Sequence, residues 1–196
     1  MDTLEKDKYK YVKNIIPKDI VEFLSGWSLK NFKLNGDSQA PHSSVHHSNQ
    51  SEIYRHIIHY LLPKMQEESG LELKPIYSYN RIYLPGSDLK IHNHRPSCEI
   101  SASITLKYHY EDKQYRWPLF MGDTPLIIET GDGVIYKGCD IPHWRPVFAQ
   151  PKECWHHQLF VHYVNKNGPY SDLKEEVTMD DFKFNKNQHG KPDIGV

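Results

Sequence analysis

The stretch YLPGSDLKIHNHRPSCEIS, residues 83–101, contains two histidines, His92 and His94, spaced two apart at the expected start of a strand. Side chains along a strand alternate between its two faces, so both histidines are expected to point the same way. Such a pair provides half of a metal site. The remaining ligand must come from a distant part of the chain, and the surrounding pattern has to provide the strands that bring it close.

A third histidine follows in GDGVIYKGCDIPHWRP, residues 131–146, where His143 comes after an apolar strand and a turn rich in glycine. Three neutral imidazoles on one face of a barrel would leave coordination positions open for water, dioxygen or substrate. With 13 histidines in the chain, a chance His-x-His pair is common. The flanking segments are therefore needed to support the interpretation.

Strand-like segments dominate the chain after residue 72. Two amphipathic helices are expected first, in PKDIVEFLSGW (17–27) and in SEIYRHIIHYLLPKMQEESG (51–70), where Pro63 disturbs the helical period. Turn residues then separate the expected strands KPIYSYNRIYL (74–84), EISASITLKYHY (99–110), WPLF (117–120), PLIIET (125–130), GVIYKG (133–138) and HHQLFVHYV (156–164). Two helices leading into many short strands predict a mainly β sandwich or barrel with flanking helices.

Composition limits the class of partner. The chain has 196 residues with a formal net charge of -1, so charge indicates neither nucleic acid nor membrane. The expected partner, a small-molecule or peptide substrate, is not announced by charge. Three cysteines without paired spacing argue against a disulfide framework. The charged N-terminus lacks the apolar run of a signal peptide, and no segment reaches membrane-spanning length. We therefore expect a cytoplasmic protein.

The segment YLPGSDLKIHNH resembles the 2-oxoglutarate- and Fe(II)-dependent oxygenases, in particular their prolyl-4-hydroxylase-like branch, in which a Tyr-x-Pro-Gly turn precedes a His-x-Asp metal motif. Together with WPLF, GDGVIYKGCDIPHWRP and QLFVHYVNKNGPY, it is similar to a small phage and bacterial branch of that superfamily, over about residues 10–172.

The resemblance implies a double-stranded β-helix, the cupin-like jelly roll, with Fe(II) held by His92, His94 and His143 and 2-oxoglutarate chelating the iron. Tyr83 falls on the tyrosine that hydrogen-bonds the cosubstrate. The expected organisation is a single domain over residues 1–180, with a helical N-terminal part (1–70), a jelly-roll core (72–170) and a polar tail (181–196).

Position 94 departs from the pattern of the superfamily, because histidine replaces aspartate. The exchange removes an anionic ligand and disfavours the higher oxidation states of iron. Three-histidine sites occur in cupin-type iron dioxygenases, and zinc held by three histidines can activate water. The segment meets half of the cupin pattern through Glu99, but Leu106 stands where that pattern has glycine. A three-histidine metalloenzyme without 2-oxoglutarate and a catalytically inactive jelly-roll binding protein stay as alternatives.

The distal carboxylate of 2-oxoglutarate needs a buried cation, because an unpaired carboxylate in a pocket is costly. Lys152 fits the prolyl-hydroxylase pattern, in which a lysine follows the last histidine, although its offset from His143 is about one residue short. Arg145 competes through its bidentate guanidinium, and Lys107 on the preceding strand is a third candidate. A solvated strand face is the expected setting for His156, His157 and His162. The leading prediction is a hydroxylase that uses Fe(II) and 2-oxoglutarate.

Overall fold

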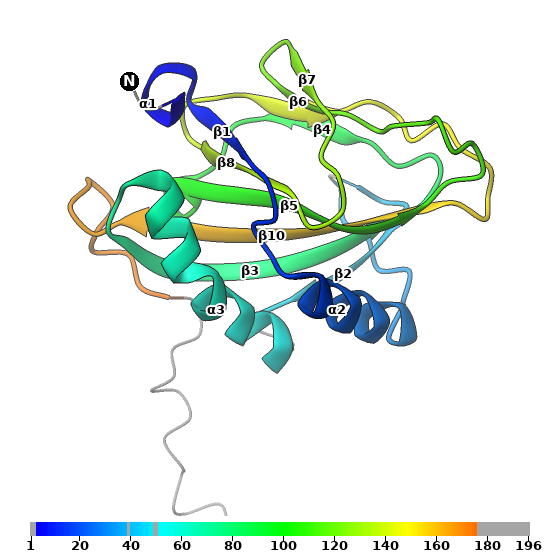
Figure 1. Cartoon of the computed structure of the whole chain (residues 1–196), viewed down its shortest axis with the longest axis horizontal. Coiled ribbons are helices and arrows are strands. Elements are labelled where there is room, and N and C mark those ends of the chain that lie inside the picture. Colours follow the sequence, from blue (N-terminus) through cyan, green and yellow to red (C-terminus); the bar gives the residue numbers. More distant parts are fainter. Residues whose placement is uncertain (1–2, 39, 49–50, 176–196) are drawn as a thin grey trace, which may run out of the picture.

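A computed structural model describes residues 3–38, 40–48 and 51–175 (Figure 1). The tail expected over residues 181–196 lies outside this part of the chain. The helices are α1 (Thr3–Asp7), α2 (Lys18–Lys30), α3 (Glu52–Ser69) and the 3-10 turn η1 (Pro96–Cys98). None of the described helices is long and apolar enough to cross a membrane.

The two longer helices form where the apolar period predicts them. Pro17 is the N-cap of α2. Helix α3 runs through Pro63, whose ring lies on the exposed side, so this proline does not end the helix as its disturbance of the pattern suggested. The helix ends at Gly70, which has a left-handed φ of 69° and donates its N–H to the Gln66 carbonyl.

The ten strands of the described residues fall into two antiparallel sheets. They are β1 (Tyr9–Val12), β2 (Ser43–His47), β3 (Leu73–Tyr83), β4 (Leu89–His92), β5 (Ile100–His109), β6 (Leu119–Met121), β7 (Thr124–Leu126), β8 (Gly133–Lys137), β9 (His143–Arg145) and β10 (Trp155–Asn165). The larger sheet has the order β1-β8-β5-β10-β3-β2 and the smaller one β4-β9-β6-β7.

The sheets and helices form three layers. In Figure 1 the smaller sheet covers one face of the larger sheet, and α2 and α3 cover the other. Apolar residues of the helices, such as Leu24 and Leu61, share one buried cluster with strand residues such as Ile104 and Val161. The mainly β jelly roll with flanking helices is therefore confirmed.

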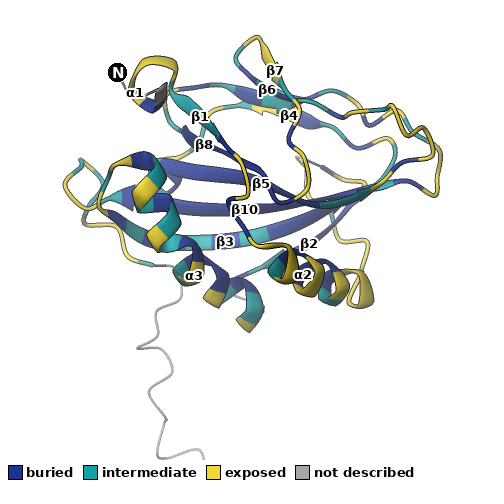
Figure 2. Cartoon of the chain, in the orientation of Figure 1, coloured by how far each residue is buried: buried dark blue, intermediate teal, exposed yellow. Residues whose placement is uncertain are grey.

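The central strands β5 and β10 are buried on both faces (Figure 2). Alternation gives their two faces different chemistry. Ala102 and Leu159 belong to the apolar cluster against the helices, whereas Ser101, Gln158 and His162 take part in polar contacts in the space between the sheets. The interior of the jelly roll therefore places a few polar groups among buried apolar clusters, as is typical of a binding site.

Some boundaries differ from the sequence expectation. The N-terminal 70 residues contain the strands β1 and β2, which pair with β8 and β3 and were not anticipated. Strand β4 ends at His92, so His94 lies beyond the strand. In the segment 125–130 only the first two residues, Pro125 and Leu126, are in a strand. Short edge strands carry too little pattern to be recognised from sequence.

Candidate metal and cosubstrate site

The structure brings His92, His94 and His143 together. His92 ends β4 directly opposite His143 in β9. His94 lies two residues beyond His92, where its backbone N–H donates to the Gly138 carbonyl over 2.9 Å. Each of the three histidines offers a ligand atom within 4.8 Å of the other two.

Backbone carbonyls fix the tautomers of two of these histidines. The Nδ1 of His92 lies 2.7 Å from the Lys90 carbonyl oxygen, and that of His143 lies 3.2 Å from the Ile141 carbonyl oxygen. A carbonyl oxygen only accepts, so both Nδ1 atoms carry the proton and donate. In each neutral ring the Nε2 atom then keeps its lone pair for a metal.

A serine does the same for His94. The Ser101 hydroxyl donates to the Cys98 carbonyl oxygen over 2.9 Å, so its Oγ must accept from the His94 Nδ1 at 3.0 Å. The Nε2 atoms of His94 and His143 face one another at 3.0 Å. In these tautomers no proton lies between the two nitrogens, and their lone pairs repel unless a cation takes both.

Burial keeps the imidazoles of His94 and His143 neutral by lowering their pKa values. Desolvation, followed by the neighbouring His162 and His92, lowers the pKa of His94 to about 2. Desolvation, followed by His94 and His92, lowers the pKa of His143 to about 2. Neutral imidazole is the form that binds a metal ion, so no proton has to leave these rings at neutral pH.

Two of the three expected cations lie in the wrong place for a buried carboxylate. Lys152 lies in an exposed turn between β9 and β10. Lys107 lies at the surface, where its Nζ forms an ion pair with the Glu22 carboxylate at 2.6 Å. Spacing suggested Lys152, and position on the preceding strand suggested Lys107, but neither clue reports burial, and both lysines lie at the surface.

Of the three candidate cations, Arg145 is the one that lies buried. It lies two residues after His143 on β9 and therefore on the same side of the strand, displaced by about 7 Å. Its guanidinium donates to the Trp117 carbonyl oxygen over 2.8 Å and to the Gln158 Oε1 over 3.2 Å, and it lies over the Trp117 ring. Burial lowers its pKa. Among the described residues it has no carboxylate partner, and its Nε has no acceptor. A buried charge of this kind favours an anionic ligand.

The Tyr83 hydroxyl lies in the same aromatic cluster. The Tyr83 ring contacts the Trp117 ring at 5.0 Å. Burial raises the pKa of Tyr83, with the Arg81 and Arg145 charges opposing the shift, so the hydroxyl keeps its proton. Within the described part of the chain this buried hydroxyl has no hydrogen-bond partner. It is available to donate to a ligand.

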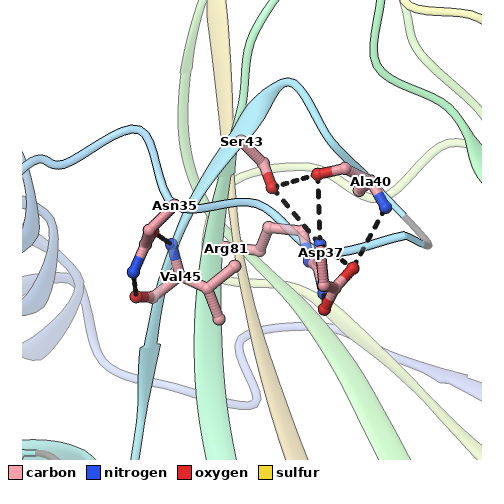
Figure 3. A network of polar contacts seen from close by, with 6 residues as sticks. All are labelled: Asn35, Asp37, Ala40, Ser43, Val45 and Arg81. Atoms are coloured by element: carbon pink, nitrogen blue, oxygen red, sulfur yellow. Dashed lines mark hydrogen bonds and ion pairs between the residues drawn. The ribbon is translucent and has the colours of Figure 1, made fainter.

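A pocket of about 440 Å³ opens beside the histidines, lined among others by Tyr77, Tyr79, Arg81, His92 and His94. No pattern in the sequence pointed to Arg81, a single arginine on the inner face of β3. Figure 3 shows its guanidinium held against Asp37, the Ser43 hydroxyl and the Ala40 carbonyl. Its charge is neutralised by the Asp37 carboxylate at 2.8 Å.

The three histidines of β10 are buried, which corrects the expected solvated face. His156 bonds to the Tyr110 hydroxyl, and His157 to the Asn80 amide oxygen. His162 bonds to the Ser101 Oγ. The sequence analysis predicted a solvated face because the strand is rich in polar residues, but these side chains lie in the protein interior.

Comparison with known proteins rests on structure. The sequence matches no protein-family model and no curated protein. The structure is similar to a prolyl-4-hydroxylase of Pseudomonas putida, with 15% identity, a TM-score of 0.59 and coverage of 82% of this chain and 95% of that one. The fold is that of the 2-oxoglutarate- and Fe(II)-dependent oxygenases.

Two further structures have this oxygenase fold. A 2OG-Fe(II) oxygenase family protein from Burkholderia pseudomallei has 12% identity and a TM-score of 0.64, with coverage of 85% and 89%. HygX from Streptomyces hygroscopicus, bound to nickel, 2-oxoglutarate and hygromycin B, has 10% identity and a TM-score of 0.63, with coverage of 84% and 85%. Zinc as an alternative to iron finds no support in these comparisons.

Proposed function

We propose that the chain is a mononuclear non-haem dioxygenase that uses Fe(II) and 2-oxoglutarate to hydroxylate a small molecule or a peptide side chain. The observation that carries the proposal is the 3.0 Å contact between the Nε2 atoms of His94 and His143, in rings whose Nδ1 atoms each face a protein oxygen. The similarity of the fold to that of oxygenases supports the same class of reaction.

The residues present suit both groups. His92, His94 and His143 would hold iron through their Nε2 atoms, whose lone pairs are free. Arg145 and Tyr83 would hold the distal carboxylate of 2-oxoglutarate, because both carry buried polar atoms without a partner in the described chain. Iron and 2-oxoglutarate bound together supply the oxidation of a C–H bond by dioxygen, with succinate and carbon dioxide as co-products.

The protein contributes orientation and exclusion of water. The carbonyls of Lys90 and Ile141 and the hydroxyl of Ser101 hold the three imidazole rings in their metal-binding tautomers. Since all three ligands are neutral, the charge of the cation is left for the carboxylates of the cosubstrate to balance. This arrangement favours an anionic keto acid as the next ligand.

The substrate would enter through the pocket beside the histidines. Its lining is mostly polar with tyrosine rings, which suits a small polar molecule or a peptide side chain. All three cysteines are unpaired, and we propose a reducing, cytoplasmic setting on that ground.

Assay of succinate tests the proposal. Purified protein supplied with Fe(II), 2-oxoglutarate and air should convert 2-oxoglutarate to succinate, and His143→Ala should abolish the conversion. His109→Ala is the matched control, since His109 is exposed on β5 and should leave the rate unchanged. Absence of succinate together with absence of Fe(II) binding would overturn the proposal.

The second candidate is a three-histidine metalloenzyme that does not use 2-oxoglutarate. The observation that favours it is the histidine at position 94, which makes the described cluster free of carboxylates. It would leave Arg145 buried without an anion. Fe(II) binding unaffected by 2-oxoglutarate would favour this candidate over the oxygenase.

A further inference from the structure

A second cluster of ligand atoms borders the three histidines. Cys98, His162 and His94 each offer one donor atom, and these atoms lie within 4.8 Å of one another. Cys98 ends η1, and His162 lies opposite Ser101 where β10 pairs with β5. Cys98 and His162 have no place in the proposed iron site, so their position needs its own explanation.

His162 has an unused lone pair in the protein interior. Its side chain is 1% exposed, and its Nδ1 lies 2.8 Å from the Ser101 Oγ. With the hydroxyl proton on the Cys98 carbonyl, the tautomer that satisfies Ser101 has His162 donating from Nδ1, which leaves the lone pair on Nε2. This Nε2 has no hydrogen-bond partner in the part of the chain that the structure describes.

Burial raises the pKa of the Cys98 thiol, while the Tyr77 and Ser97 hydroxyls and the Arg95 charge oppose that shift and would support a metal-bound thiolate. Cys98 is 3% exposed, and its sulfur lies 3.0 Å from the Tyr77 hydroxyl and 3.7 Å from the Ser97 hydroxyl. The Arg95 guanidinium lies over the Tyr77 ring at 5.2 Å, which brings a positive charge near the sulfur. Binding of a cation would release the thiol proton to solvent, and the Tyr77 O–H would then donate to the sulfur.

We propose that Cys98, His162 and His94 form a second binding site, for a thiophilic divalent cation. One thiolate and two imidazoles are a ligand set typical of such ions. His94 is shared with the three-histidine site, and its Nδ1 is committed to Ser101, so only one lone pair serves both sites. The two sites are therefore mutually exclusive, and a cation at the cysteine site withdraws His94 from the other.

Cobalt(II) provides a direct test, because a cobalt–thiolate bond gives a near-ultraviolet charge-transfer band that histidine ligands do not give. Co²⁺ added to the metal-free full chain should produce this band at one ion per chain. Cys98→Ser should abolish the band. His162→Gln should weaken the cobalt affinity, measured by titration of this band, at least tenfold. Cys139→Ser, which changes a half-exposed cysteine outside the cluster, should leave the band unchanged.

His92→Ala separates the two sites, since it disables only the three-histidine set. The band should persist in this variant. Four results would each overturn the proposal. The band could be lost in His92→Ala, persist in Cys98→Ser or be absent from the unaltered protein, or two cobalt ions could bind per chain. Far-ultraviolet circular dichroism checks the folding of Cys98→Ser, and His162→Gln gives an independent variant. The test involves neither 2-oxoglutarate nor succinate, so failure of the oxygenase proposal would not affect it.

Discussion

The Nε2 atoms of His94 and His143 face each other at 3.0 Å, while the Nδ1 atom of each ring donates to an oxygen of the protein. This contact looks like a hydrogen bond by distance alone, but neither nitrogen has a proton to give. The hydrogen-bond partners behind the rings therefore determine how the pair is interpreted. A metal ion is the ligand that turns this repulsion into two favourable bonds.

Ser101→Ala should weaken Fe(II) binding by about 10- to 100-fold, the usual effect of removing a group that orients a metal ligand. The His94 imidazole would lose the oxygen that fixes its tautomer. Ser103→Ala is the matched control, because Ser103 lies on the same strand and bonds only to the Gln158 amide among the described contacts. Equal losses of Fe(II) affinity in calorimetry would show that Ser101 has no special role.

Arg145→Gln should weaken 2-oxoglutarate binding to the Fe(II)-loaded protein by about 1.5–3 kcal/mol, the cost of a lost charged hydrogen bond. That is roughly a 10- to 150-fold rise in Kd. Arg145→Lys should retain part of the affinity because it keeps the charge. Lys152→Gln and Lys107→Gln should have no effect, since both lysines lie at the surface. If Lys152→Gln weakens binding and Arg145→Gln does not, the cation has been assigned to the wrong residue.

Tyr83→Phe should have opposite effects on the two states of the protein. Without ligand, removal of a buried hydroxyl that lacks a partner should raise the free energy of unfolding by about 1 kcal/mol. With iron bound, the loss of one neutral hydrogen bond should weaken 2-oxoglutarate binding by a similar amount. Urea unfolding and ligand titration measure the two effects. Unchanged 2-oxoglutarate affinity would remove Tyr83 from the cosubstrate site.

Acid should destabilise the metal-free protein. Burial, as the main cause, lowers the pKa of His143 to about 2 and the pKa values of His157 and His162 to about 3. In the unfolded chain histidine titrates near pH 6.5, so below that pH the unfolded state binds more protons than the folded state. Each buried histidine should then remove up to about 1.4 kcal/mol of stability per pH unit.

Urea unfolding at pH 8, 7, 6 and 5.5 measures this dependence. Stability should be fully present above pH 6.5 and should fall steeply below it. His109→Asn, at an exposed position of β5, is the control for replacing a histidine as such. A free energy of unfolding that stays constant from pH 8 to 5.5 would contradict the buried, neutral state of these rings.

Part of the three-histidine cluster is readable from the sequence. Close spacing makes His92 and His94 neighbours, whereas His143 reaches them only through the pairing of β4 with β9, which the expected jelly roll supplies. The two longer helices could also be predicted, because the apolar periodicity that indicates a helix lies within a single segment of the sequence. The roles of His92, His94 and His143 as metal ligands remain a prediction.

The surroundings of the cluster could not be predicted in the same way. Ser101 and His162 lie 61 residues apart in the chain, and their contact depends on the pairing of β5 with β10. The choice of Arg145 over Lys152 depends on burial, which a single sequence does not reveal. A polar strand pattern usually indicates a surface, but in this jelly roll polar side chains lie inside. The sequence analysis therefore wrongly expected the histidines of β10 at the surface.

The central claim is that the three histidines hold iron in a form that accepts 2-oxoglutarate. Its most direct test is an anaerobic titration of the metal-free protein with Fe(II) and then with 2-oxoglutarate, followed by visible absorption. The account predicts a charge-transfer band when the keto acid chelates the iron, lost in His143→Ala and weakened in Arg145→Gln. Iron binding without the band would contradict the account.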